Sequence, residues 1–191
     1  MIKRSTVFAL VLMLCSASAV AAADWPHLRG PGHDGRTTTT GLFDRDEVGL
    51  EVAWTRPIGS GYSGIVAAGG RVFTAFAEGD GDWVGAFDAG TGEPLWRHRL
   101  GGVTRGVDGS DDGPLSTPTV GKDALYALAP DGTLYALRLK DGKELWSKDL
   151  VADLGGARPY FGFTTTPLLV GETLIVQAGG EDGKFLIGLD P

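Results

Sequence analysis

The sequence Gly85-Ala-Phe-Asp-Ala-Gly-Thr-Gly-Glu-Pro-Leu-Trp96 returns in altered form as Tyr135-Ala-Leu-Arg-Leu-Lys-Asp-Gly-Lys-Glu-Leu-Trp146. An Asp-Gly pair precedes each stretch, at residues 80–81 and 131–132, and recurs at 182–183, a spacing of 51 each time. Self-similarity at a period of this size is typical of repeat folds, in which each repeat is one small structural unit. The chain is therefore interpreted as tandem copies of one unit.

Each copy is predicted to contain four short strands. Asp-Gly between alternating apolar residues indicates a tight hairpin, because the favoured two-residue turn needs positive φ at both positions. No stretch after residue 24 shows the period of a helix. A four-stranded antiparallel unit repeating at this interval is typical of a β-propeller blade. In the second copy the predicted strands are 116–120, 124–129, 133–139 and 144–150.

The expected fold class is all-β, a partial β-propeller of four-stranded antiparallel blades. The chain holds about two to three blades, whereas a closed ring needs at least ~4, so a seven- or eight-bladed parent is expected. The stretch around Trp54 is interpreted as an outer strand that closes the ring. The expected division is a signal peptide (1–23), an N-terminal extension (24–50), the outer strand of the closing blade (51–61), blade 1 (62–100), an inter-blade loop and blade 2 (101–150), and an inter-blade loop and incomplete blade 3 (151–191).

The N-terminus has the pattern of an export signal. Lys3 and Arg4 form a basic start, residues 7–14 are apolar, and small residues ending at Ala23 fit a cleavage site. An uncleaved anchor is the weaker alternative, because a bilayer-crossing helix needs ~20 apolar residues. A lipoprotein signal at Cys15 is another. The protein is expected in the periplasm or outside the cell, with no membrane span after signal cleavage.

Composition excludes several function classes. The net charge of −7 at neutral pH repels phosphate, which excludes nucleic acid as a partner. Cys15 is the one cysteine and lies in the leader, so the exported protein is expected to have no disulfide, thiol nucleophile or zinc–thiolate site. Glycine makes up 31 of the 191 residues, which indicates many turns.

Two motifs resemble those of the secreted PQQ-like (pyrroloquinoline quinone repeat) β-propellers. Residues 86–96 match the tryptophan-docking motif A-x-D-x-x-T-G-x-x-x-W in full, and the second copy keeps its Ala, Gly and Trp. Residues 24–35 are similar to the W-P-x-x-R-G-P-x-x-D-G opening of these propellers. The resemblance relates the fold to quinoprotein dehydrogenases and to the propeller lipoprotein of the outer-membrane barrel-assembly machinery.

The resemblance implies that the motif residues lock neighbouring blades together. Asp88 is expected to accept backbone N–H groups across its turn, and Gly92 to supply a left-handed backbone. Trp96 is expected to bury its ring against the next blade. The complete blade-docking set is Ala86, Asp88, Thr91, Gly92, Trp96, Ala136, Gly142, Trp146 and Trp54.

No catalytic, cofactor-binding or metal-binding residue is predicted. For quinoprotein dehydrogenases the resemblance implies a calcium site that includes Asn and a quinone packed against adjacent cysteines, and the sequence has no Asn and no second cysteine. PQQ and calcium are expected only in a longer parent chain. Asp108, Ser110 and Asp112 are spaced like the first half of a calcium loop, but Thr119 stands where the bidentate Glu belongs.

The candidate functional region is formed by the long inter-blade connections, 101–114 and 151–163, because long loops often carry function. The strand order places both on the same face as the Asp-Gly hairpins. Acidic, Arg and aromatic groups together suit a protein or polymer partner; the alternative is that the aromatic pair simply plugs the channel side. This candidate partner-binding loop face comprises Arg105, Asp108, Asp111, Asp112, Arg158, Tyr160 and Phe161.

These features predict a non-catalytic exported propeller that acts as a protein-binding or scaffold module of the cell envelope. The alternative is the N-terminal part of a PQQ-dependent quinoprotein oxidoreductase with its catalytic blades downstream. A third hypothesis is a carbohydrate-binding propeller that uses Trp83, Tyr160 and Phe161.

Overall fold

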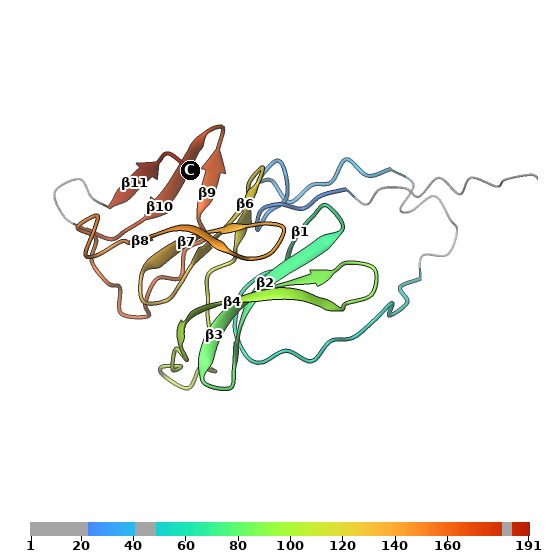
Figure 1. Ribbon diagram of the computed structural model, residues 1–191, viewed down its shortest axis with the longest axis horizontal. Coiled ribbons are helices and arrows are strands. Elements are labelled where there is room, and N and C mark those ends of the chain that lie inside the picture. The colour runs from blue at the N-terminus through green and yellow to red at the C-terminus, as the bar shows by residue number, and fades with distance from the viewer. Residues whose placement is uncertain (1–22, 41–48, 181–184) are drawn as a thin grey trace, which may run out of the picture.

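The computed structural model describes residues 23–40, 49–180 and 185–191, so most of the expected signal peptide and the third Asp-Gly pair lie outside it. The described residues form three antiparallel sheets, with no α-helix among them (Figure 1). The strands of blade 1 are β1 (Val66–Ala68), β2 (Arg71–Glu78), β3 (Gly81–Asp88) and β4 (Pro94–Gly102). Those of blade 2 are β5 (Thr119–Val120), β6 (Ala124–Leu128), β7 (Thr133–Arg138) and β8 (Glu144–Asp149). The third sheet has β9 (Leu168–Val170), β10 (Thr173–Gln177) and β11 (Leu186–Leu189).

Each full blade is a simple meander, because the strands pair in chain order, β1-β2-β3-β4 and β5-β6-β7-β8. The third sheet has the order β11-β10-β9 and contains no fourth strand within the described residues. The predicted all-β fold of four-stranded antiparallel blades is confirmed. The inner strand of blade 2 is shorter than predicted, since β5 begins only after Pro118, which has no N–H to donate to a sheet.

The sheet of blade 2 is buried on both faces, which explains its imperfect alternation of apolar and polar residues. Leu125 and Leu137 pack toward blade 1, in a cluster with Phe73 and Val84. The alternate positions, including Leu134, pack toward the third sheet in a second cluster with Leu174, Val176 and Phe163. Because neighbouring side chains along a strand point to opposite faces, one apolar strand contributes to both cores.

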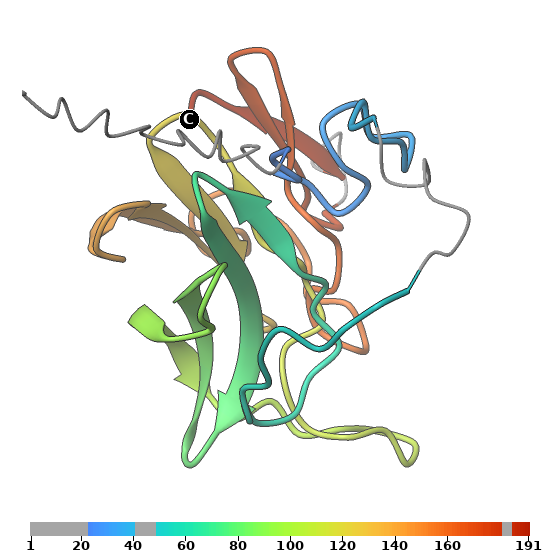
Figure 2. The same ribbon diagram turned by 90° about the vertical axis from the view of Figure 1, so that its right-hand side faces the viewer.

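The start of the N-terminal extension, at Trp25 and Pro26, runs beside the inner strands. Trp25 and Ala67 exchange both backbone hydrogen bonds, at 2.7 and 2.9 Å, and Val120 donates its N–H to the Pro26 carbonyl at 2.9 Å. This part of the chain therefore adds main-chain hydrogen bonds to β1 and β5, and Figure 2 shows it beside the inner edge of blade 1.

Residues 51–61 pair with no described strand except through an isolated bridge between Ser60 and Ala77, so the outer strand of the closing blade stays a prediction. A strand requires a hydrogen-bonded neighbour along its length, and no described strand lies beside residues 51–57. Side chains hold this segment in place. The Trp54 indole N–H donates to the Ala89 carbonyl at 3.0 Å, and Arg56 Nε donates to the Gly92 carbonyl at 2.8 Å.

Hydroxyl groups of blade 2, on Ser116, Thr117 and Thr119, connect it to the neighbouring sheets. The Ser116 hydroxyl donates to the Thr165 carbonyl at 2.9 Å, and the Thr119 hydroxyl donates to the Pro167 carbonyl at 2.5 Å. The Gly64 N–H donates to the Thr117 hydroxyl at 2.8 Å. These side chains act as structural bridges between neighbouring sheets.

Over the described part of the chain there is no helix with the length and apolar character that crossing a bilayer requires.

Candidate functional site

The docking tryptophans lie over glycines of the following blade. Trp96 comes from β4 of blade 1, and its indole N–H donates to the Leu139 carbonyl of blade 2 at 3.0 Å. Its ring covers Gly142, which has a φ of 69°. Trp54 makes the same pair of contacts on Ala89 and Gly92, although it comes from a segment that is not a strand. Trp96 thus connects blade 1 to blade 2, and Trp54 makes equivalent contacts on the β3–β4 turn of blade 1.

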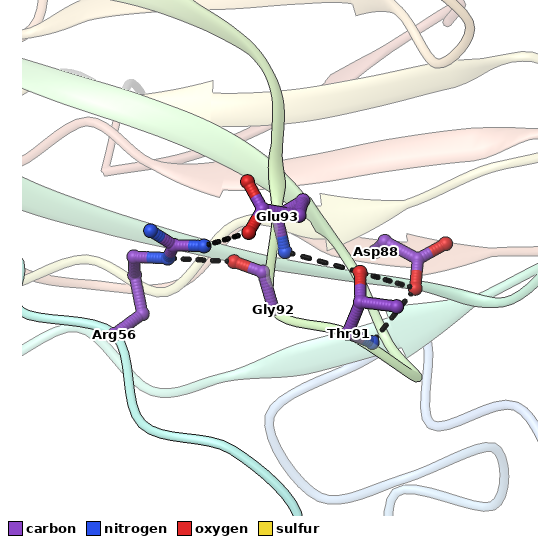
Figure 3. Close-up of polar contacts among 5 residues, drawn as sticks. All are labelled: Arg56, Asp88, Thr91, Gly92 and Glu93. Atoms are coloured by element: carbon purple, nitrogen blue, oxygen red, sulfur yellow. Dashed lines mark hydrogen bonds and ion pairs between the residues drawn. The ribbon is translucent and has the colours of Figure 1, made fainter.

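The turn that receives Trp54 is held by Asp88 (Figure 3). Its Oδ1 accepts the N–H groups of Gly90 and Thr91 at 3.0 and 2.9 Å, and the Thr91 hydroxyl at 3.0 Å. The Thr91 hydroxyl in turn accepts the Glu93 N–H. These donors favour the carboxylate, and the bonds from Thr91 contribute most to lowering the pKa of Asp88 below its ordinary value of 3.8. Ala86, which is fully buried, completes the motif in blade 1.

The second copy reaches the same turn with different residues. Arg138 replaces Asp88 and pairs with Asp141 at 3.3 Å. Asp141 replaces Thr91, and its Oδ1 accepts the Lys143 N–H at 3.2 Å. Ala136 is fully buried and Gly142 lies under Trp96, as the repeat predicts. Trp146 packs on the core between blade 2 and the third sheet, with its ring 6.1 Å from that of Tyr126.

The predicted loop face surrounds a cleft of about 410 Å³ between blades 1 and 2. Both long inter-blade loops contribute to it, as do the end of β4 and the β6–β7 hairpin. Its floor includes the buried residues Leu100, Ala129 and Pro130. Of the predicted loop-face residues, those that line the cleft are Arg105, Asp111, Arg158, Tyr160 and Phe161.

The acidic residues of the first loop mainly hold the loop itself. Asp112 accepts the Gly106 N–H at 2.9 Å and a bond from Arg105 at 2.5 Å; the bond from Gly106 contributes most to lowering the pKa of Asp112, and Arg105 lowers it further. The Asp111 N–H donates to the Tyr62 hydroxyl at 2.8 Å. Asp108 lies apart from the cleft in an exposed turn with a φ of 54°. Of the seven predicted loop-face residues, Asp108 and Asp112 therefore do not line the cleft.

The second loop supplies the exposed part of the rim. Tyr160 and Phe161 are 77% and 53% exposed, with their rings edge to face at 4.9 Å. Arg158 makes no ion pair or side-chain hydrogen bond with any described residue. Both rings are outside the core in this structure, and the aromatic residue of this loop that joins the core is Phe163, at 1% exposure.

Asp82 also lines the cleft, and sequence reasoning missed it. Its side chain is 1% exposed; Oδ2 accepts the Thr104 N–H at 3.0 Å, while Oδ1 is buried with no hydrogen-bond partner among the described residues. Burial raises the pKa of Asp82 above 3.8, the bonds to Thr104 oppose the rise, and the nearby charges of Asp112 and Asp131 add to it. In the sequence, its place after an Asp-Gly pair indicates only a turn.

The residues present do not fit a calcium-bound quinone at this cleft. Both oxygens of Asp112 already accept protein donors, and the Ser110 hydroxyl donates to the Val107 carbonyl. Within the three described segments, no group of three or more His, Cys, Asp or Glu side chains is arranged to hold a metal ion. The chemistry that the arrangement does offer is binding: aromatic faces, a cationic rim and one unsatisfied buried carboxylate.

The chain is similar to proteins of outer-membrane assembly. Residues 41–191 match the family model described as outer membrane protein assembly factor BamB. The BamB of Burkholderia pseudomallei is 29% identical over 147 residues, which cover 75% of this chain and 32% of that protein. The BamB of Kangiella koreensis is 35% identical over 95 residues, 47% of this chain and 22% of that protein. The chain thus spans at most about a third of these curated relatives.

Among solved structures, the quinohemoprotein alcohol dehydrogenase ADHIIG of Pseudomonas putida HK5 superimposes with a TM-score of 0.60 at 21% identity, covering 83% of this chain and 23% of the enzyme. The quinohemoprotein alcohol dehydrogenase of Comamonas testosteroni superimposes with a TM-score of 0.59 at 22% sequence identity. The match covers 86% of this chain and 24% of that enzyme. At this identity the likeness shows a shared propeller fold and nothing of activity. With the docking motif, the blade meander and the family match over residues 41–191, the chain belongs to the BamB family of PQQ-like β-propellers.

Proposed function

We propose that the chain is part of an exported, non-catalytic propeller scaffold of the cell envelope, which binds a polypeptide partner at the cleft between blades 1 and 2. The observation that carries the proposal is the rim of that cleft, where Tyr62, Tyr160 and Phe161 are each at least half exposed. Aromatic and Arg side chains are the residues enriched at protein interfaces. The names of the curated relatives, assembly factors of the outer membrane, support a binding role in the envelope.

Hydrogen bonds within the protein also order the loops that form the rim of the cleft. Tyr62 is fixed by the N–H of Asp111, and Arg105 is fixed by Asp112, so the first loop is ordered by its own hydrogen bonds. The Phe163 N–H donates to the Pro130 carbonyl at 3.0 Å, which ties the second loop to blade 2. A rigid surface loses little conformational entropy on binding, which favours affinity.

Site-specific photocrosslinking in the living cell tests the proposal. A photoreactive side chain at position 160 should give discrete protein adducts in the envelope fraction. The same substitution at Lys140 is the matched control, because Lys140 is exposed in the β7–β8 turn at the opposite end of the strands. Adducts at 140 but none at 160 would contradict the proposal, and so would the absence of protein adducts at both positions.

The quinoprotein alternative rests on the shared fold. Adding PQQ and calcium to the full-length exported protein tests it directly, since a bound quinone absorbs visible light. A stoichiometric bound-quinone spectrum with dye reduction would overturn the non-catalytic proposal; an unchanged spectrum would support it.

A further inference from the structure

We propose that the cleft receives a cationic side chain of the partner polypeptide, best fitted by an arginine guanidinium, and that the Asp82 carboxylate anchors it. This inference rests on the proposed function, because it names the chemistry that the partner must present. A buried carboxylate oxygen without a donor costs free energy, and proteins rarely leave one unsatisfied. Oδ1 of Asp82 is such an atom, and it lies at the wall of a cleft.

The sheet register places Asp82 at the wall of the cleft with no side chain on its paired residue. Asp82 is paired across β3 and β4 with Gly101, and side chains of directly paired residues lie on the same face of a sheet. Gly101 has no side chain to cover the carboxylate. A Cβ atom at Gly101 would lie 3.8 Å from Asp131 Oδ2, another residue of the cleft wall, so this face of the strand looks into the cleft.

The charges of the wall favour a cation. Asp82, Asp111 and Asp131 all line the cleft. Arg105 lines it as well, but its charge is neutralised by Asp112 at 2.5 Å. The remaining cation, Arg158, belongs to the exposed second loop and not to the floor. A positive group that reaches the floor therefore meets a local excess of carboxylate.

The rest of the cleft suits the body of an arginine side chain. Leu100, Ala129 and Pro130 offer an apolar floor to its methylene groups. Tyr160 and Phe161 at the rim offer ring faces, on which a planar guanidinium stacks better than a lysine ammonium does. A guanidinium also presents several N–H donors in one plane, so it can donate to Asp82 Oδ1 and to a second acceptor at once.

Binding of small probes to the full-length exported protein, measured by calorimetry and saturation-transfer NMR, tests the inference. The probes are N-acetyl-argininamide and its uncharged isostere N-acetyl-citrullinamide. The arginine probe should bind at least ~10-fold more tightly than the citrulline probe, as expected for a hydrogen bond to a charged group. Asp82→Asn, which keeps the shape of the side chain, should remove that preference. Asp80→Asn is the control, because Asp80 is exposed on the same hairpin and pairs with Arg99.

A second variant guards against a folding effect of the first. Gly101→Leu should block the cleft from the neighbouring strand and abolish arginine binding while leaving the carboxylate in place. Equal affinity for both probes, or an unchanged preference in Asp82→Asn, would overturn the inference. Displacement of the arginine probe by micromolar calcium would overturn it too, in favour of a metal site.

The two proposals fail in distinguishable ways. If position 160 crosslinks to a protein but the arginine probe shows no preference, the cleft binds a partner without a cationic anchor. If the arginine probe binds through Asp82 but no crosslink forms in cells, the anchor is real and the polypeptide-scaffold proposal is wrong.

Discussion

The ring of Trp96 lies so close above Gly142 that a Cβ atom at position 142 would overlap the indole. Gly142 also has a φ of 69°, a backbone conformation that residues with side chains adopt only with strain. Glycine is thus required at this junction for two independent reasons, and Trp54 and Gly92 repeat the relationship at the previous one.

Gly142→Ala should lower the free energy of unfolding much more than alanine at a glycine that has a positive φ but no close neighbours. Gly171 has a φ of 59° and open space around it, so Gly171→Ala should cost about 1 kcal/mol from backbone strain alone. Gly142→Ala adds overlap with a packed ring and should cost about 3 kcal/mol. Urea unfolding of the two variants measures the difference. Equal losses would show that Trp96 yields to the methyl group.

Trp96→Phe should loosen the junction between blades 1 and 2. The change removes the indole N–H donated to Leu139, a loss of about 1 kcal/mol, together with part of the ring contact. Hydrogen exchange should therefore quicken in the β7–β8 turn, which belongs to the other blade. Trp83→Phe is the control, because the Trp83 indole donates to Glu78 within its own blade. Faster exchange in both variants at that turn would contradict a specific docking role.

Asp88 should stabilise the protein only while it is ionised. Its pKa is lowered in the folded state, so its contribution is present above the unfolded value of 3.8 and is lost as the pH falls through the folded pKa. Asp88→Asn retains an acceptor oxygen without the charge. Urea unfolding at pH 7 should find the variant less stable than the natural protein, with the two converging on acidification. A constant difference down to pH 2 would refute the assignment.

The effect of Asp82 on protein stability should depend on pH in the opposite direction. Because its folded pKa is raised, the protein should lose stability as the pH rises from 3.8 through the folded pKa, when the buried carboxylate must ionise. Asp82→Asn should then raise stability at pH 7, by about 1 kcal/mol. Thermal melting of the variant and the natural protein between pH 4 and 8 measures this difference in stability. A variant that is more stable but binds the arginine probe less well is the pattern expected of a binding residue; a destabilised variant would indicate a structural one.

Much of the fold could be read from the residues directly. The blade meander was predictable from Asp-Gly pairs and short apolar stretches, but the expected turn with positive φ at both positions is wrong, since neither Asp80 nor Asp131 has a positive φ and the left-handed residues are Gly79 and Gly132. The turn around Asp88 was equally predictable from the sequence, since its carboxylate accepts N–H groups two and three positions along the chain. The location of the loop face followed from strand order, which puts alternate turns at the same end of a sheet.

The sequence alone determined the repeat, the blades and the docking glycines. Each of these depends on local backbone preferences or on a sequence pattern that recurs at a constant spacing. Only the tertiary structure decided that Asp82 is a buried wall residue instead of part of an exposed turn. Whether a strand forms or a carboxylate is buried depends on what distant segments place beside it. For Asp82 those segments are the loop at Thr104, which follows β4 of the same blade, and the hairpin at Asp131, which approaches it only when blade 2 packs against blade 1.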